Sequence, residues 1–331
     1  MSWRKSPNPV DTETVSVSYE EPKRRAGRRK FPLSSVLLPI LFLFLHQIVL
    51  NVMAYLRVFI YAIKTGLMGD DLVRVLSRPD LLIEFFMESD AQNIGSIWAM
   101  LILIPIYLLY LFLRRRRDPG VLRLQKQGPR TFIESAVLIL GTMGMTQLWM
   151  TFLLLFREGE NFFGQALRDY MSQAEMLTSS GSKLWIQVLA LVVLVPIAEE
   201  LLFRGIIQGE LSLRYSRKVT VIVSSLVFAV FHFNLVQGTY VLFAGIILAL
   251  AYEFTNNLLV PIFMHMVFNF IGGGILQEVL DLRESGGTVL LVIMLLAIPL
   301  ACAVLIIWFK RDKAKRISAS SGLEQAGGGQ E

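Results

Sequence analysis

Long apolar runs dominate this 331-residue chain and constrain its fold more than any other feature. Hydrophobic residues make up 54% of the sequence, and the mean hydropathy is +0.56. Several runs approach or exceed the roughly 20 residues that a helix needs to cross a bilayer. A soluble protein of this length would show shorter, amphipathic stretches instead. The sequence therefore predicts an all-α, polytopic helical membrane protein.

About eight transmembrane helices are predicted from these runs. Their approximate ranges are 33–63, 94–113, 131–156, 184–212, 219–236, 239–253, 257–274 and 287–309. The chain then divides into a basic tail (1–32), N-terminal transmembrane spans (33–183), a four-span core (184–274), a C-terminal span (275–310) and a second tail (311–331). The first tail is polar and has no apolar signal-peptide region, so we expect a disordered segment there. The single cysteine, Cys302, lies in the last span and is expected to be a core residue.

Basic residues cluster beside the predicted spans and orient them. They are Lys23, Arg24, Arg25, Arg28, Arg29 and Lys30 before the first span, Arg114, Arg115, Arg116 and Arg117 after the second, Arg214, Arg217 and Lys218 after the fourth, and Lys310, Arg311, Lys313, Lys315 and Arg316 after the eighth. With eight spans these clusters fall on one side, which the positive-inside rule makes cytoplasmic, together with both termini. This topology explains the net charge of +6. No aromatic and basic pattern of a nucleic-acid module is present, so nucleic acid is not an expected partner.

Three charged residues lie inside the predicted fourth span: Glu199, Glu200 and Arg204. Such groups are costly at membrane depth and are kept where they face protein or water and have partners, so they indicate a functional site. Glu200 and Arg204 are four residues apart and share a helix face. Glu199 is rotated by about 100° from Glu200. We therefore expect one carboxylate to face a cavity and the other to pair with Arg204.

All three histidines of the chain, His46, His232 and His265, lie within predicted spans. His265 shares a helix face with Asn269, and His232 shares one with Phe228, because each pair is four residues apart. His46 is expected to be structural or to snorkel towards the membrane surface, as is Arg57 in the same span.

The positions of these residues along the spans predict their depth. Glu199 lies 17 residues before Ser216 and His232 lies 16 after it, so a helical hairpin places both roughly 25 Å from the turn. His265 and Asn269 follow Asn257 by 8 and 12 residues, which places them only roughly 12–18 Å from their turn. The two estimates disagree unless the fourth helix extends beyond the membrane surface, but one polar cluster within the bilayer is expected.

The cluster leaves two hydrolytic chemistries open. A glutamate near two imidazoles can activate water while a histidine or asparagine stabilises the oxyanion, and this chemistry requires no cofactor. Alternatively, Glu199, His232 and His265 form a zinc ligand set with a fourth position for water. No His-Glu-x-x-His motif occurs, so three helices would have to assemble that site. Serine catalysis is not favoured, because Gly-x-Ser-x-Gly is absent beside Ser224 and Ser225.

The three motifs together resemble a known family. Glu199-Glu200-x-x-x-Arg204, Phe228-x-x-x-His232 and His265-x-x-x-Asn269, in this order and within apolar spans, are similar to the motifs of the CAAX-protease and bacteriocin-processing family (CPBP or Abi), which includes the Ras-converting CAAX endoproteases. The resemblance covers residues 184–274. It implies an intramembrane endopeptidase with a four-span catalytic core.

The resemblance also implies a role for each motif residue. Glu199 would be the general base that activates water, His232 would assist at that water, and His265 and Asn269 would hold or polarise the scissile carbonyl. The supporting residues would be the ion pair of Glu200 and Arg204 and the packing residue Phe228. The family has been described as glutamate proteases and as metalloproteases. The ligand spacing gives no independent zinc signature, which favours hydrolysis without a metal.

The expected partners are the lipid bilayer and a membrane-associated protein or peptide substrate, cut near the bilayer. A prenylated CAAX tail is one such substrate, although the motifs describe the catalytic centre and not substrate choice. Two other functional classes stay open: a non-catalytic membrane partner or immunity protein on the same fold, and a proton-coupled transporter. A purely structural reading assigns the polar residues to hydrogen bonds between helices.

Overall fold

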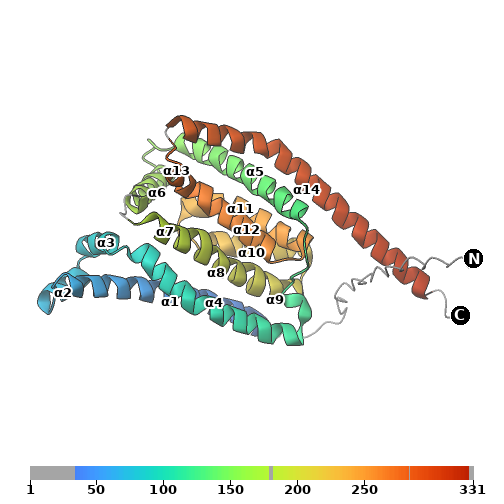
Figure 1. Cartoon of the computed structure of the whole chain (residues 1–331), viewed down its shortest axis with the longest axis horizontal. Coiled ribbons are helices and arrows are strands. Elements are labelled where there is room, and N and C mark those ends of the chain that lie inside the picture. Colours follow the sequence, from blue (N-terminus) through green and yellow to red (C-terminus); the bar gives the residue numbers. More distant parts are fainter. Residues whose placement is uncertain (1–33, 179–181, 283, 328–331) are drawn as a thin grey trace, which may run out of the picture.

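The computed structural model of the protein describes the backbone of residues 34–178, 182–282 and 284–327 (Figure 1). The predicted tail 1–32 and the last four residues of the predicted second tail lie outside the described residues. Within the described ranges the fold is all-α, as predicted, and the only β-type pairing is an isolated bridge between Leu124 and Asn257.

The N-terminal half consists of long helices joined by shorter ones. These are α1 (Ser34–Lys64), α2 (Asp70–Ser77), α3 (Pro79–Glu88), α4 (Ala91–Arg117), the 3₁₀ turn η1 (Pro119–Val121), α5 (Pro129–Leu154) and α6 (Phe162–Thr178). Residues 184–212 then form one continuous helix in five parts. They are α7 (Leu184–Gln187), the π-helical η2 (Val188–Leu194), α8 (Val195–Glu200), the π-helical η3 (Leu201–Gln208) and α9 (Gly209–Ser212). The remaining helices are α10 (Arg217–Val230), α11 (Leu235–Thr255), α12 (Leu259–Gly272), α13 (Ile275–Val279) and α14 (Glu284–Gly327).

Six helices of the described chain are long and apolar enough to cross a membrane: 37–64, 91–117, 129–154, 184–212, 235–255 and 285–318. They match six of the eight predicted spans. The other two, predicted at 219–236 and 257–274, are the 14-residue helices α10 and α12. At 1.5 Å per residue each is about 21 Å long, shorter than the roughly 30 Å hydrocarbon core.

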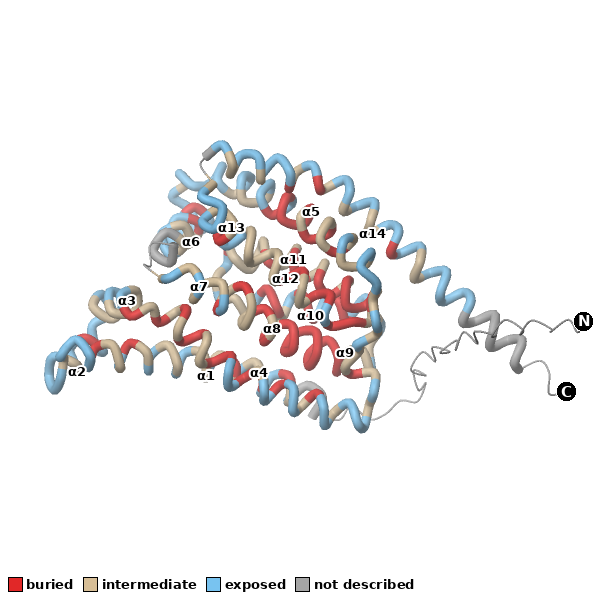
Figure 2. The backbone as a smooth tube through the Cα atoms, viewed as in Figure 1, coloured by how far each residue is buried: buried red, intermediate tan, exposed pale blue. Residues whose placement is uncertain are grey.

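The helix formed by residues 184–212 lies in the middle of the bundle (Figure 1). It packs against α4 on one side and against α10 and α12 on the other, while α14 lies along α5 and α1 lies along α4. Residues 200–210 are all buried, which makes this stretch the most enclosed part of the chain (Figure 2). A helix that is enclosed on every side must satisfy its charged residues internally.

The basic clusters at the ends of these helices meet at one end of the bundle. Arg114 at the end of α4 contacts Glu210 in α9, with Nε 2.5 Å from Oε1. Arg217, at the start of α10, pairs with Asp312 of α14 at 2.6 Å. Within the described residues, the clusters after the second, fourth and eighth predicted spans therefore lie at one end, as predicted, whereas the cluster at 23–30 lies outside the described residues. The assignment of this end to the cytoplasm stays a prediction.

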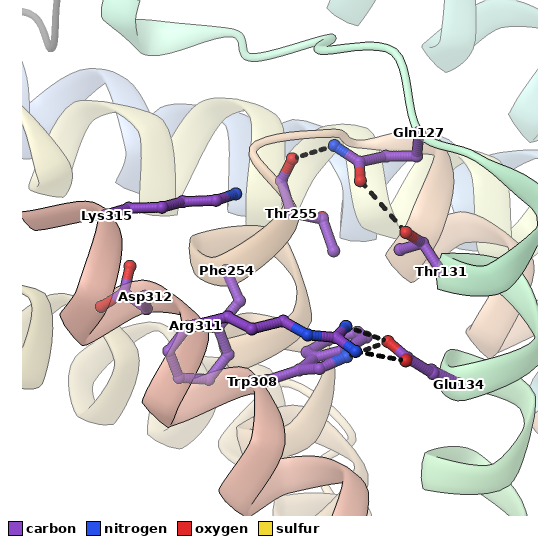
Figure 3. Close-up of a pocket in the computed structure, with 9 residues that line it drawn as sticks. All are labelled: Gln127, Thr131, Glu134, Phe254, Thr255, Trp308, Arg311, Asp312 and Lys315. Carbon is purple, nitrogen blue, oxygen red and sulfur yellow. Dashed lines mark hydrogen bonds and ion pairs between the residues drawn. The ribbon is translucent and has the colours of Figure 1, made fainter. Parts of the chain in front are cut away.

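A polar patch at the same end attaches α14 to the rest of the bundle (Figure 3). Glu134 of α5 accepts hydrogen bonds from the indole of Trp308 at 2.6 Å and from Arg311 at 2.8 and 3.0 Å. Beside it, Gln127 donates to the carbonyl oxygen of Thr255 at 2.6 Å. The prediction that Cys302 is a core residue was wrong. It is exposed, because α14 packs mainly against α5 and leaves its other faces open.

Glycines allow α5 and α14 to approach closely along their length. A methyl group on Gly144 would overlap the backbone carbonyl of Met294, and one on Gly141 would overlap the backbone carbonyl of Ala297. Neither obstacle is a flexible side-chain end, so the helices would have to separate. Close approach at small residues is a common basis of helix packing in membranes.

We therefore expect Gly144→Ala to destabilise the protein by about 1–3 kcal/mol, the usual cost of overpacking. Gly287→Ala in α14 is the matched control, because its added methyl meets nothing within 4 Å and alanine is favoured over glycine in a helix by about 1 kcal/mol. Thermal unfolding in detergent measures both. Equal midpoints for the two variants would contradict the close packing of α5 on α14.

Candidate active site

Glu200 is the centre of a buried charge network. Its Oε1 accepts a hydrogen bond from Nη1 of Arg204 at 2.8 Å and lies 2.8 Å from Nδ1 of His265. Glu200 and Arg204 are completely buried, and His265 is 5% exposed. The ion pair predicted from the four-residue spacing is therefore present, and a histidine from α12 joins it.

His265 lies between the two adjacent glutamates. Its Nε2 is 3.6 Å from Oε2 of Glu199, which is within ion-pair distance but longer than a hydrogen bond. An ionised Glu200 can only accept, so the proton of His265 is held on Nδ1. The Glu199 side chain is 15% exposed, whereas that of Glu200 is fully enclosed. The two carboxylates thus diverge as their helical angle predicts, but the same histidine contacts both.

Two further contacts fix Arg204, one with a backbone carbonyl and one with an aromatic ring. Its Nη2 donates to the carbonyl oxygen of Gly245 at 3.2 Å, and its guanidinium lies 4.6 Å from the centre of the Phe228 ring. A cation over an aromatic face is favourable, more so when both are desolvated. A Cβ on Gly245 would lie 3.1 Å from the Phe228 ring, so glycine makes room for this stack. Within the described chain, Oε2 of Glu200 and Nε of Arg204 have no hydrogen-bond partner.

Phe228 is the aromatic centre around which both histidines are arranged. Its ring centre lies 4.9 Å from that of His232, 5.8 Å from that of His265 and 4.9 Å from that of Phe203, all in edge-to-face geometry. Such contacts are favoured by the ring quadrupoles. Phe228 therefore connects α10 to the charge network of α8 and α12.

The range 219–236 predicted that His232 lies inside a helical span, but the structure places it after the end of a helix. Helix α10 ends at Val230, and His232 sits in the turn that follows. Its Nδ1 is 2.8 Å from the carbonyl oxygen of Phe228. A carbonyl only accepts, so Nδ1 is the donor and Nε2 carries the lone pair. The bond satisfies one of the free carbonyls at the end of α10 and leaves Nε2 able to accept a hydrogen from water.

Asn269 donates to the carbonyl oxygen of Leu191 at 2.8 Å, a contact that its spacing from His265 did not predict. The reason lies in the helix backbone. The N–H of Val195 bonds to Ala190, five residues back, and the next residue, Pro196, has no N–H. The carbonyl of Leu191 is therefore left without a helical partner. The sequence signal that could have revealed this was the proline inside an apolar span.

The π-helical segment η3 shortens the arm whose length was used to predict the depth of Glu199. It lies between Glu199 and the turn at Ser216. A π-helical turn closes on the fifth residue, so it uses more residues per turn than an α-helix. The arm from Ser216 to Glu199 is consequently shorter than an α-helical count gives. The shortening acts in the direction that reduces the disagreement between the two predicted depths.

A third histidine lies near the same site. His46 is 1% exposed, which excludes snorkelling, and its Nδ1 is 3.0 Å from the hydroxyl oxygen of Tyr107. Tyr107 lies on α4, which packs directly on α8, the helix that carries Glu199. No local spacing connects α1 and α4 with Glu199, because contacts between distant spans depend on tertiary packing.

The alternative zinc ligands, Glu199, His232 and His265, do not fit a metal site in this arrangement. Among the described residues, no group of three or more His, Cys, Asp or Glu side chains is placed to hold a metal ion. Nδ1 of each histidine is hydrogen-bonded, to the carbonyl oxygen of Phe228 for His232 and to Glu200 for His265, a contact that metal-bound histidines also make. Nε2 of His265 faces Glu199 at 3.6 Å.

Comparison with known families gives one match. The family model for type II CAAX prenyl endopeptidases, described as Rce1-like, matches residues 181–271. The matched segment contains every motif residue from Glu199 to Asn269, and it confirms the resemblance to CAAX proteases predicted from the motifs. His46 and Tyr107 lie outside it. The searches of curated proteins and of solved structures gave no match.

The charge network predicts different effects for the two glutamates. Glu200→Gln should lower the free energy of unfolding by about 3–5 kcal/mol, because it leaves Arg204 buried without its counter-ion. Glu199→Gln removes a more exposed carboxylate that has no hydrogen bond to Arg204, so we expect a much smaller change. Thermal unfolding of both variants in detergent tests this. Equal losses of stability would contradict the assignment of Glu200 as the structural carboxylate.

The contact between Asn269 and Leu191 predicts a coupling with Pro196. Asn269→Ala should cost about 1–3 kcal/mol, because it leaves a carbonyl unpaired. Pro196→Ala restores an N–H that can serve this carbonyl, so the cost of Asn269→Ala should fall by at least ~0.5 kcal/mol in that background.

A double-mutant cycle of unfolding free energies measures this coupling. Asn51→Ala is the matched control, because Asn51 also donates its amide to a backbone carbonyl, that of Gln47 at 2.7 Å, but on an exposed part of α1. Its cost should not depend on residue 196. If the Asn269 and Pro196 changes are additive, the proline is not the cause of the unpaired carbonyl.

Proposed function

We propose that this protein is an intramembrane endopeptidase in which Glu199 activates water to hydrolyse a peptide bond of a membrane-associated protein. The observation that carries the proposal is the position of His265 between the partly exposed Glu199 and the enclosed Glu200. The match to a CAAX endopeptidase family supports a protease of this general type. The helices that surround the site support a substrate that reaches it within the bilayer.

The proposed reaction uses Glu199 first as a base and then as an acid. Its carboxylate takes a proton from water, and the water oxygen forms a bond to the carbonyl carbon of the scissile peptide. The tetrahedral intermediate then collapses, the C–N bond breaks, and Glu199 returns the proton to the leaving nitrogen. General acid–base catalysis of this kind typically contributes a factor of about 10²–10⁴.

The other motif residues would orient the reactants. Nε2 of His232 carries a lone pair and can accept the second hydrogen of the water, since its Nδ1 is held by the carbonyl of Phe228. Asn269 uses one amide hydrogen for Leu191 and has a second one for the scissile carbonyl oxygen. His265, anchored through Nδ1 on Glu200, presents Nε2 beside Glu199. Donors aimed at the developing oxyanion are the largest source of stabilisation in such reactions.

The ion pair of Glu200 and Arg204 would keep Glu199 as the reactive carboxylate. The guanidinium neutralises Glu200, so the adjacent glutamates do not carry two uncompensated charges in the same enclosure. Glu200 in turn fixes the tautomer of His265. No step of the proposal is routed through a metal ion.

We extend the proposal to a substrate with a prenylated carboxyl-terminal CAAX tail, because the matching family is described as prenyl endopeptidases. A lipid-modified tail gains about 0.8 kcal/mol for each CH₂ group that it buries in the bilayer. It therefore concentrates in the same apolar phase as the site. Both the prenyl group and the choice of CAAX sequence are parts of this proposal that experiment must separate.

Purified protein in liposomes should cleave a fluorogenic peptide that ends in a farnesylated CAAX sequence. We expect Glu199→Gln to lower kcat by about 10²–10⁴, because the base is removed while the shape of the side chain is kept. Glu158→Gln is the matched control, since Glu158 is 94% exposed and lies outside the site. Cleavage by Glu199→Gln at the rate of the wild type would contradict the role of Glu199.

Four further arms separate the remaining alternatives. The same peptide without its farnesyl group tests whether the lipid is required. A zinc chelator such as 1,10-phenanthroline should leave cleavage unchanged if Glu199 acts on water directly. A precursor that accumulates in membranes of Glu199→Gln cells would identify a natural substrate by proteomics. Proton flux into liposomes that depends on Glu199, without peptide cleavage, would favour a transporter instead.

A further inference from the structure

A second hydrogen-bonded pair lies near the site, contributed by helices outside the segment that matches the protease family. His46 comes from α1 and Tyr107 from α4. Nδ1 of His46 and the hydroxyl oxygen of Tyr107 are 3.0 Å apart, and the two rings stack at 6.3 Å with an angle of 16°. His46 is 1% exposed and Tyr107 is fully buried.

Packing places this pair against the elements that carry Glu199 and His232. Helix α4 packs directly on α8, and Tyr107 belongs to the same buried cluster as Ala198, the neighbour of Glu199. The ring of His46 lies edge-on to Phe231, the neighbour of His232, at 5.3 Å.

The pair has one hydrogen more than its shared bond uses. A neutral histidine has one N–H and a tyrosine has one O–H, and only one of these hydrogens lies between Nδ1 and the hydroxyl oxygen. If His46 donates, the hydroxyl hydrogen is spare. If Tyr107 donates, the Nε2 hydrogen of His46 is spare. In either tautomer one hydrogen of this enclosed pair is left over from the shared bond, and a donor in such surroundings needs an acceptor.

Glu199 is the acceptor that this donor can serve. Its contact with His265, at 3.6 Å, is longer than a hydrogen bond, and within the described part of the chain its carboxylate makes no hydrogen bond. The aromatic rings around His46 and Tyr107, those of Phe42 and Phe231, offer no comparable acceptor. A carboxylate in an apolar enclosure and a spare donor beside it complement each other.

We propose that His46 and Tyr107 are positioning residues of the Glu199 site, which donate their spare hydrogen towards the Glu199 carboxylate, directly or through a water molecule. The pair holds the carboxylate in the orientation in which it takes the proton from the attacking water. The N-terminal helices α1 and α4 thereby contribute to the reaction. This inference rests on the proposed function for its kinetic consequence, but not for the contact itself.

The kinetic test uses the farnesylated CAAX peptide with the full-length protein in liposomes. Tyr107→Phe and His46→Leu should each lower kcat about tenfold, the effect of one hydrogen bond on a barrier, and should change KM less than twofold. His46→Asn should keep most of the rate, because its amide nitrogen lies near the position of Nδ1 and can still donate to the tyrosine. A merely structural role would not be rescued in this way.

Tyr170→Phe is the matched control. Tyr170 and Tyr240 form a similar pair, with hydroxyl oxygens 3.1 Å apart, between α6 and α11. Removing that hydroxyl should leave kcat at the wild-type value. A kcat of Tyr107→Phe equal to that of the wild type would overturn the inference while leaving the proposed function intact.

A second measurement is independent of cleavage. Thermal unfolding in detergent of the wild type, Tyr107→Phe, Glu199→Gln and the double variant gives a double-mutant cycle. The effects of the two changes should not be additive, whereas Tyr170→Phe and Glu199→Gln should be additive. If the wild type cleaves no peptide, the proposed function fails and the cycle alone decides the contact. Additivity for Tyr107 and Glu199 would then overturn it.

Discussion

The buried contact of Glu200 with Arg204 and His265 is the interaction on which the rest of the site depends. It joins α8, η3 and α12 at a single carboxylate oxygen that is fully enclosed. Such a network is expensive to bury and is strongly destabilised when one partner is removed. Its value lies in what it fixes: the tautomer of His265, and through it the direction from which an imidazole nitrogen faces Glu199.

Backbone carbonyls link the fold to the site. In lipid, every backbone group needs a partner within the protein. Here His232 donates to Phe228, Asn269 to Leu191 and Arg204 to Gly245, and each of these carbonyls lies next to a helix end, a π-helical turn or a close helix contact. Thus the same side chains complete the backbone of short or interrupted helices and form the polar cluster. Irregular backbone at this depth is tolerated because it faces these groups and not the lipid.

Local spacing explains which parts of this arrangement could be predicted from the sequence. The pair of Glu200 and Arg204 and the divergence of Glu199 follow from 3.6 residues per turn, and both are present. Helix type was predicted for the six long apolar runs, but not every length, since α14 runs from Glu284 to Gly327 where 287–309 was predicted. The early end of α10 before His232 was missed, because an apolar run does not reveal where a helix stops. Both π-helical segments were also missed, and η2 depends on Pro196 together with a partner from α12. The contact of His265 with both glutamates is tertiary and follows from no spacing within one helix.

The family match and the structure describe different parts of one enclosure. The matched segment, 181–271, supplies the charge network and the motif histidine and asparagine side chains. It does not close the space around Glu199, since α4 packs on α8 and brings Tyr107 and His46 to that side. A general base needs residues that orient its side chain as well as residues that orient the substrate. If residues from α1 and α4 orient Glu199, then helices outside the matched segment determine how firmly its carboxylate is held. Two proteins with the same motifs could therefore differ in rate through their N-terminal helices alone.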